Sequence, residues 1–366
     1  MTISAYAPGR VELLGNHTDY NEGVVIGVAI DLGLTVQGSQ RDDGVVSLES
    51  ASMGEVKVAL SELRPVEQSS WANYQLGVVN ELIKLKIPIN GFSAFVSGDL
   101  PPGCGLSSSA ALELATALFL LKLVGGDLPR LEIAKACQRA EHNFVGVQSG
   151  LLDQVTSLFG RADHVVFFDA RTEEVRVLPF PPELALLIAD SGRKRTLATG
   201  DYNRRRLETR AAADALDVAA LRDVSSVTLA RVRGLPDLLR RRATHIVQEN
   251  ERVWRALELL AAGDGAGFGA LMNASHQSSQ ENFENSTPEL DLLVSIAHEL
   301  PGVLGARLTG GGFGGATVTL CQRYAAVNVA KELAERFARK RGTVPHVMVA
   351  RIGAGAALVD GQPKAE

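Results

Sequence analysis

Apolar residues recur along this chain with two periods, one typical of strands and the other of helices. Stretches rich in β-branched and aromatic residues predict strands at Gly23–Leu32, Gly91–Ser97, Val165–Phe168, Val175–Pro179, Leu184–Ala189, Gly315–Cys321 and Val347–Ile352. Longer stretches with helical spacing predict helices at Trp71–Leu85, Ala110–Val124, Leu131–Phe144, Tyr202–Leu216, Leu238–Ala262, Leu290–Ala297 and Ala325–Lys340. The chain therefore mixes both element types.

The balance between the two periods changes near residue 180. Strands and helices are mixed before this point, and long helical patterns dominate after it, which indicates a domain boundary there. The stretch Ala261–Ala270 (AAGDGAGFGA) is rich in glycine and alanine but short, so we interpret it as a turn between two helices.

Composition narrows the class of protein. The chain has 366 residues, enough for two domains, and a formal net charge of −5, which gives no general attraction to nucleic acid or anionic membrane. The cysteines Cys104, Cys137 and Cys321 follow no metal or disulfide spacing, as is typical of a reducing compartment. The first ten residues lack a secretion signal, and the most apolar stretch, Ala110–Val124, is too short to span a bilayer. We expect a cytoplasmic monomer that binds neither nucleic acid nor membrane.

A first candidate motif, GRVELLGNHTDYNEG, spans residues 9–23. Arg10, His17 and Asp19 lie here within ten positions, together with a tight turn and at the end of an expected strand. So many polar groups beside apolar strand residues raise the question of what they hold.

A second motif, PPGCGLSSSAALELA, spans residues 101–115. Proline and glycine disfavour regular structure up to Leu106, and a serine run then leads into strong helix formers, with Ser107 or Ser108 as the candidate N-cap. A helix start offers unpaired N–H groups to an anion such as phosphate, and serine hydroxyls can ligate Mg²⁺. An ordinary capped helix also explains the pattern, and the lack of GxxxxGK[ST] excludes a P-loop.

Two further stretches carry candidate chemistry. RLTGGGFGGATVTL, residues 307–320, is dense in glycine, which lets a backbone approach a ligand closely, although a mobile hairpin would look the same. Two glycine-rich loops in one chain, one of which opens a helix, point to a phosphoester ligand. In GLLDQ, residues 150–154, Asp153 lies among apolar residues. Such a carboxylate is a candidate base or ligand when a cation is near, or a buried group that accepts from backbone N–H.

Together and in this order, these motifs resemble the GHMP family of small-molecule kinases, and within it the galactokinases. The first motif is similar to their signature, close to GRVNLIGEHTDYN in most members, and the two glycine-rich stretches match the family's phosphate loop and late glycine loop. The likeness extends over nearly the full chain, through WANYQLGVV (71–79), AEHNFVGVQSGLLDQ (140–154), DSGRKRTLATGDYNRRR (190–206), RRRATHIVQENERV (240–253) and NFENSTPELDLLV (282–294).

The resemblance implies an α+β kinase with two domains and the active site in the cleft between them. The N-terminal domain would span residues 1–180, carry a mixed sheet and be completed by a strand within 345–360, and a ferredoxin-like C-terminal domain would span 181–345. ATP and Mg²⁺ are the implied cofactors, and the implied activity is phosphorylation of the C1 (anomeric) hydroxyl of galactose, which gives galactose 1-phosphate and ADP.

The resemblance also implies roles for individual residues. Arg10 and Asp153 match the catalytic pair: Asp153 would accept the proton of the C1 hydroxyl, and Arg10 would stabilise both that carboxylate and the phosphoryl oxygens. Other residues match the family's binding sites by their position in the motifs. The residues that match the sugar site are Asn16, His17, Asp19, Gly150 and Tyr202, and those that match the nucleotide site are Trp71, Gly103, Gly105, Leu106, Ser107, Ser108 and Ser109. Ser109 and Glu141 match the Mg²⁺ ligands.

Two positions depart from the galactokinase signature. Asn16 replaces the usual glutamate, which is expected to contact the sugar's C6 hydroxyl, and Glu12 replaces the usual asparagine. An amide donates as well as accepts, so Asn16 would tolerate a hydroxymethyl or a carboxylate at C6. We favour galactose. A kinase for galacturonate, arabinose or N-acetylgalactosamine is the alternative, and a non-catalytic sugar sensor on the same fold is a third hypothesis that the intact SSSAAL, Asp153 and Arg10 disfavour.

Other polar features receive simpler interpretations. The runs Arg204–Arg206 and Arg240–Arg242 are expected on solvated helix faces. His245 and Glu249 form an i,i+4 helical pair, for which a surface or packing role is expected rather than a metal site.

Overall fold

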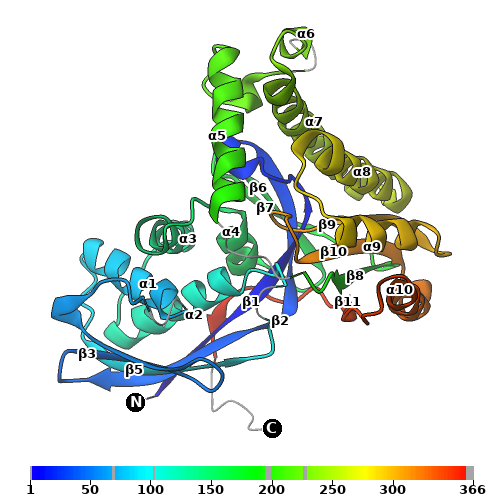
Figure 1. Cartoon of the computed structure of the whole chain (residues 1–366). Helices are drawn as coiled ribbons and strands as arrows, with labels where there is room; N and C mark the ends of the chain where they lie inside the picture. Colours follow the sequence, from blue (N-terminus) through cyan, green and yellow to red (C-terminus); the bar gives the residue numbers. More distant parts are fainter. Residues whose placement is uncertain (1, 68–70, 102–103, 194–198, 226–228, 360–366) are drawn as a thin grey trace.

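Two β-sheets surrounded by helices make up the computed structural model, which describes residues 2–67, 71–101, 104–193, 199–225 and 229–359 (Figure 1). The strands of the larger sheet are β1 (Ile3–Leu14), β2 (Val24–Arg41), β3 (Val45–Ser50), β4 (Gly54–Ala59), β5 (Gly91–Gly98), β6 (His164–Asp169), β7 (Val175–Pro179) and β12 (Ala357–Leu358). Those of the smaller sheet are β8 (Leu184–Asp190), β9 (Val303–Leu308), β10 (Ala316–Gln322) and β11 (Val347–Ala350).

The helices fall into two groups along the chain. Those before β8 are α1 (Ala72–Lys84), α2 (Ser108–Val124), α3 (Arg130–Ala140) and α4 (Leu152–Phe159), with the short turns η1 (Asp19–Asn21), η2 (Leu60–Glu62) and η3 (Glu141–Val145). Those after β8 are α5 (Thr199–Ala215), α6 (Leu229–Val232), α7 (Asp237–Ala261), α8 (Gly265–Ser278), α9 (Pro288–His298) and α10 (Ala326–Arg341), with η4 (Leu221–Asp223), η5 (Ser279–Phe283) and η6 (Arg323–Ala325). Figure 1 shows α5 and α7 projecting together away from the larger sheet.

The larger sheet is mixed, as predicted. Its strand order is β12-β1-β2-β5-β3-β4, and β6, with β7 beside it, pairs with the other end of β2. Only β3 and β5 run parallel. β2 continues to Arg41, well past the predicted end at Leu32, because residues 34–41 pair with β5 although few of them are buried. The hydrophobic pattern misses this half of the strand since tertiary pairing, not burial, makes it extended.

The smaller sheet has the ferredoxin-like arrangement that the resemblance implies. Its order is β11-β8-β10-β9, with every pair antiparallel, and α9 and α10 pack against it. The last strands divide between the sheets: β11 pairs with β8, whereas β12 pairs with β1 through Ala5 and Leu358. The division of the chain at residue 180 stays a prediction.

One hydrophobic core runs from the larger sheet into the helices that follow β8. α2 is buried along most of its length, which confirms the buried helix predicted at Ala110–Val124. Val253 of α7 and Phe268 and Met272 of α8 belong to the same core as the strands of the larger sheet. Among the residues that the structure describes, no helix combines the length and apolarity needed to cross a membrane.

The turn predicted at Ala261–Ala270 is wrong in its second half, because α8 begins at Gly265. Asp264 caps this helix by accepting from the Gly267 N–H at 2.8 Å. A Cβ on Gly269 would lie 2.3 Å from the Leu304 carbonyl oxygen. The small residues therefore permit a close helix–strand contact with β9 rather than a break in the helix.

Candidate active site

The side chains of Arg10 and Asp153, 143 residues apart in the chain, meet at the centre of the candidate site. Arg10 projects from β1, and Asp153 lies in the first turn of α4. The guanidinium donates through Nε to Asp153 Oδ1 at 2.7 Å, its Nη2 lies 2.6 Å from the same oxygen, and its Nη1 donates to the Gly105 carbonyl at 2.8 Å. One permanently charged group thus ties a strand, a helix and a glycine-rich loop together.

Ser107 lies at the predicted N-cap position of α2, but its hydroxyl does not cap the helix. It donates instead to Asp153 Oδ2, while the residue adopts the left-handed conformation with φ of 59°. Asp153 therefore has a partner on each oxygen, Arg10 on one and Ser107 on the other. The loop conformation directs the serine toward the carboxylate rather than toward the helix backbone.

Asp19 and Gly150 form a second contact, next to Asp153. Asp19 accepts from the backbone N–H groups of Tyr20 at 3.0 Å and Leu152 at 3.3 Å. Burial, and then the nearby Asp153 charge, raise the pKa of Asp19 to about 6. A Cβ on Gly150 would lie 1.7 Å from Asp19 Oδ2, so only glycine allows the carboxylate this position.

An aromatic group closes the neighbouring side of the site. His17 makes hydrogen bonds through Nδ1 with the Tyr20 hydroxyl at 2.8 Å and through Nε2 with the Gly311 carbonyl at 2.9 Å. Its ring lies 4.9 Å from that of Tyr202 and 4.6 Å from that of Phe283, centroid to centroid. The contact between His17 and Tyr202 therefore joins the first motif, residues 9–23, to α5.

Glu141 and Ser109 bring a carboxylate and a hydroxyl, both hard oxygen groups, to the same cavity. Glu141 begins the π-helical turn η3 at the end of α3, is buried, and accepts hydrogen bonds from the hydroxyls of Ser149 and Ser109. Burial raises the pKa of Glu141 to about 7, with the Asp153 charge contributing. In the described part of the chain, no group of three or more histidine, cysteine or carboxylate side chains forms a metal site.

Three of the remaining predicted nucleotide residues, Gly105, Leu106 and Ser108, lie around the start of α2. Gly105 adjoins Arg10 through its carbonyl, Leu106 is buried, and Ser108 is the first residue of α2. Trp71 directly precedes α1 and is half-buried. Gly103 lies outside the described residues.

A cavity of about 310 Å³ joins these groups. Its volume is within the range of small-molecule sites in proteins. Nine of the predicted site residues line it, namely Arg10, Asn16, His17, Asp19, Ser109, Glu141, Gly150, Asp153 and Tyr202. The cavity thus contains the predicted catalytic pair together with residues predicted for sugar and metal.

The late glycine loop, within residues 307–320, contacts the signature loop, which is the part of the first motif around Asn16 and His17. Together the two loops form one wall of this cavity. Asn16 Nδ2 donates to the Gly310 carbonyl at 2.7 Å, and the Gly311 carbonyl contacts His17 as described above. Gly312 has a φ of +76°, and a Cβ there would lie 2.2 Å from the Asn285 carbonyl oxygen. Here the glycines allow a close approach between two protein segments.

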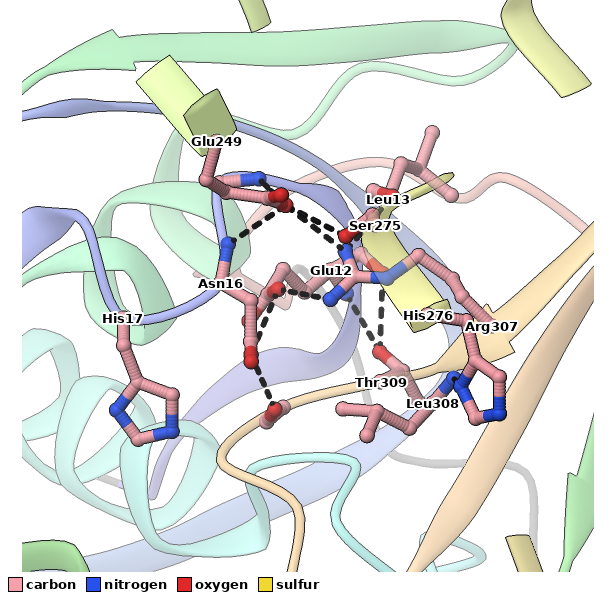
Figure 2. Close-up of polar contacts among 12 residues, drawn as sticks. Glu12, Leu13, Asn16, His17, Glu249, Ser275, His276, Arg307, Leu308 and Thr309 are labelled. Atoms are coloured by element: carbon pink, nitrogen blue, oxygen red, sulfur yellow. Dashed lines mark hydrogen bonds and ion pairs between the residues drawn. The ribbon is translucent and has the colours of Figure 1, made fainter. Parts of the chain in front are cut away.

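Sequence reasoning did not assign three buried residues to this wall: Arg307 of β9, Asn285, and Glu249 of α7, which it had interpreted only as part of a helical pair with His245. Glu249 Oε1 accepts from the backbone N–H groups of Gly15 at 3.0 Å and Asn16 at 3.2 Å, and from the Ser275 hydroxyl at 2.7 Å (Figure 2). Burial would raise the pKa of Glu249, but Arg252 and Arg307 outweigh it and hold the pKa well below its usual range. Apart from Arg252, three residues after Glu249, the partners described here are distant in sequence, so local pattern does not show how these residues meet.

The structure corrects two expectations for charged helix positions. His245 and Glu249 are both fully buried, so of the two expected roles packing is right and surface is wrong. Burial lowers the pKa of His245 to about 4. Arg205 and Arg242, expected on solvated faces, are also buried, because both reach the carboxylate of Glu208.

Comparison with known protein families agrees with this site. The chain matches the model "GHMP kinases N terminal domain" over residues 73–161, the model "GHMP kinases C terminal" over 256–339, and the model "Galactokinase galactose-binding signature" over 2–40. The last of these contains Arg10, Asn16, His17 and Asp19.

Individual relatives give the same result over the full length. The chain is 42% identical to a galactokinase of Roseiflexus sp., covering 96% of this chain and 92% of the relative, and 41% identical to a galactokinase of Homo sapiens, covering 92% and 88%. It is similar to the crystal structure of Lactococcus lactis galactokinase complexed with galactose, with a TM-score of 0.94, 33% identity, and coverage of 97% and 95%. A mevalonate kinase of Methanococcus jannaschii, at 21% identity, shares the fold with a TM-score of 0.68 over 96% and 98% of the chains. The chain belongs to the galactokinase family of GHMP kinases, and its activity is that of an ATP-dependent sugar kinase.

Proposed function

We propose that this enzyme transfers the terminal phosphoryl group of ATP to the C1 hydroxyl of galactose, with Arg10 and Asp153 at the reacting oxygen. The observation that carries the proposal is the contact between these two side chains in the cavity, at 2.6 to 2.7 Å. Family membership supports galactose as the sugar, because the relatives described above at 33% identity or more are galactokinases.

Asp153 is proposed as the acceptor of the C1 hydroxyl proton. A bond forms between the sugar oxygen and phosphorus, the bond between phosphorus and the leaving ADP oxygen breaks, and the proton passes from the sugar hydroxyl to the carboxylate. A sugar hydroxyl is a weak nucleophile at neutral pH, so positioning a base at this oxygen lowers the barrier. Arg10 and Ser107 hold the carboxylate from both sides, which fixes its direction.

Arg10 is proposed to stabilise charge on the transferred phosphoryl group. Phosphoryl transfer depends mainly on positioning and on the neutralisation of negative charge. The guanidinium is nearly buried, with 3% of its side chain exposed, and an interaction with charge is stronger there than in water. Its bond to the Gly105 carbonyl places it beside the loop proposed to bind the triphosphate, formed by Gly103, Gly105, Leu106, Ser107, Ser108 and Ser109.

Mg²⁺ is proposed to bind at Ser109 and Glu141. A carboxylate and a hydroxyl are ligands that this ion prefers, and it usually takes only one or two protein ligands beside phosphates and water. The ion would neutralise phosphate charge when bound. Glu141, with its pKa near 7, gives up its proton more readily once a cation is near. Trp71 remains a proposed contact for adenine.

The sugar is proposed to lie between the first motif, residues 9–23, and α5. Asp19 accepts hydrogen bonds from two adjacent hydroxyls, which distinguishes an axial from an equatorial 4-hydroxyl, and Gly150 leaves it room. His17 and Tyr202 complete this side. We further propose that the enzyme acts as a cytoplasmic monomer; the free thiols of its three cysteines support a reducing compartment.

A coupled ADP-release assay with Mg·ATP against hexoses, uronic acids and pentoses tests the proposal. We expect galactose to give the highest kcat/KM, and Asp153→Ala or Arg10→Ala to abolish turnover while circular dichroism remains that of the wild type. Near-wild-type rates in either variant would remove that residue from the mechanism. Highest activity on galacturonate, arabinose or N-acetylgalactosamine would replace galactose. Tight sugar and ATP binding without any transfer would indicate a sensor.

A further inference from the structure

Glu12 and Asn16, the two positions that depart from the galactokinase signature, are in direct contact. Asn16 Nδ2 donates to Glu12 Oε1 at 3.1 Å, and Arg307 Nη2 lies 2.9 Å from the same oxygen (Figure 2). All three side chains are almost completely buried, yet Glu12 and Asn16 line the cavity. The usual signature has the amide at position 12 and the carboxylate at 16, so this chain keeps the same two groups in exchanged positions.

The surroundings fix the orientation of the Asn16 amide. Nδ2 faces only acceptors: the Glu12 carboxylate and, at 2.7 Å, the Gly310 carbonyl. Oδ1 faces a donor, the Asn285 Nδ2, at 2.8 Å. A flipped amide would place Oδ1 against two oxygens, so it is strongly disfavoured. Both N–H groups of Asn16 are occupied, and the side chain has no donor left for a ligand.

Glu12 adds carboxyl oxygens, which are hydrogen-bond acceptors, to this corner of the cavity. It projects from β1 two residues after Arg10, on the same face of the strand. Burial raises the pKa of its carboxyl, and the charges of Arg307 and Arg10 oppose that rise while Glu249 adds to it. Arg307 contacts Glu12, is fully buried and does not line the cavity, so its guanidinium offers no hydrogen-bond donor to a ligand there.

We propose that Glu12 and Asn16 form one specificity-determining pair, which makes this corner accept a neutral hydroxyl and exclude an anionic substituent. The proposal rests on the proposed function and on the expectation, from the resemblance, that position 16 contacts the C6 substituent of the sugar. It replaces the expectation that the amide of Asn16 tolerates a C6 carboxylate. Asn16 contributes only an acceptor, and Glu12 repels the carboxylate of a uronic acid.

A double-mutant cycle tests whether the two residues form one unit. Asn16→Glu alone places two buried carboxylates in contact, and Glu12→Asn alone leaves Arg307 without its carboxylate partner, so we expect each to lower kcat/KM for galactose at least about tenfold. The double variant, which restores the usual order, is expected to recover to within about fivefold of wild type. If the double variant is folded and its loss equals the product of the single losses, the pair is not a unit.

A second measurement tests selectivity separately from stability. Glu12→Gln keeps the size of the side chain but removes its charge and adds a donor, so the ratio of kcat/KM for galactose over galacturonate is expected to fall at least about tenfold. Glu49→Gln, at an exposed position of β3, is the matched control and is expected to leave the ratio unchanged. An unchanged ratio in folded Glu12→Gln would overturn the proposal. A wild type inactive on galactose would overturn the proposed function instead.

Discussion

Two arginine–carboxylate contacts lie beside the same cavity, Arg10–Asp153 in what we call the reacting wall and Arg307–Glu12 in what we call the buried wall, and they differ in exposure. At the Arg10–Asp153 pair the carboxylate side chain is 25% exposed, whereas at the Arg307–Glu12 pair the exposed fractions are 0% and 3%. The first carboxylate is open to a substrate and can exchange a proton with it. The second carboxylate is enclosed by protein groups, which use most of its capacity to accept hydrogen bonds. We propose that the same ion-pair chemistry serves reaction at one wall and shape and selectivity at the other.

The wall around Arg307 also holds the signature loop in place. Glu249 takes the backbone N–H groups of Gly15 and Asn16, and Arg252 donates to its other oxygen at 2.7 Å. Glu12 and Glu249 thus lie against Arg307 and Arg252 in a cluster of four buried charged side chains. A buried network of this kind stabilises only while every partner is present.

Replacing one arginine by lysine in each wall is the sharpest way to distinguish the roles of the two walls. Arg10→Lys keeps the charge but cannot contact Asp153 and the Gly105 carbonyl together, so we expect kcat to fall about 10³-fold. Arg252→Lys in the buried wall is the matched variant and is expected to lower the thermal midpoint while kcat stays within about threefold of wild type. Steady-state kinetics and thermal melts check both. Equal losses of kcat would contradict the division.

Gly150→Ala tests the contact on the substrate side. Its Cβ would overlap Asp19 Oδ2, so the carboxylate must move, and we expect kcat/KM for galactose to fall about 100-fold, mainly through KM. Gly146→Ala, nearby but with nothing within 4 Å of the added Cβ, is the steric control; its positive φ makes a small loss of stability expected. Unchanged KM in Gly150→Ala would show that Asp19 does not need this position.

Glu249→Gln tests the buried wall for stability. Removal of this carboxylate leaves Arg252 without its ion-pair partner and Arg307 with Glu12 alone, so we expect the free energy of unfolding to fall by about 3 kcal/mol, as measured by urea denaturation. Because the pKa of Glu249 is depressed in the folded state, its contribution is present above the unfolded pKa and is lost as pH falls further toward the folded value. Wild-type stability in the variant would contradict a structural role.

The pH dependence of metal and sugar binding distinguishes the groups of the reacting wall. Glu141, with its pKa near 7, must lose a proton to bind Mg²⁺, so apparent Mg²⁺ affinity is expected to fall about tenfold per pH unit below 7. Asp19, at about 6, predicts a rise of KM for galactose below pH 6. Because the pKa values of both carboxyls are raised in the folded state, their contribution to the free energy of unfolding is present below the unfolded pKa. It is lost as the pH rises through the folded pKa. Steady-state kinetics from pH 5 to 8, with Mg²⁺ and galactose each varied, check both predictions. An apparent Mg²⁺ affinity and a KM for galactose that do not change with pH would contradict them.

Local pattern predicted the elements with strong periodicity and the motifs with dense glycine or serine. α2, α10 and β8 lie close to their predicted bounds because burial and period agree there. The second half of β2 and the start of α8 were missed, because pairing with β5 and close packing on β9 decide them. Both effects are tertiary.

The reacting wall could be proposed from motif resemblance, and the buried wall could not. Arg10, Asp19 and Asp153 lie inside short motifs, so position alone marks them. Arg307 and Glu249 have partners up to nearly three hundred residues away, and nothing in their local sequence indicates burial. Glu12 and Asn16 show the same limit: the sequence reveals two departures, and only the contact between them shows that the two belong together.

The most direct test of the central claim is single-turnover phosphoryl transfer by Asp153→Asn, measured by rapid quench together with galactose binding by calorimetry. The amide retains the size of the carboxylate but cannot accept the proton from the C1 hydroxyl. We predict that transfer falls at least about 10³-fold while the galactose dissociation constant stays within about fivefold of wild type. A transfer rate close to that of the wild type would contradict the assignment of Asp153 as the group that accepts this proton.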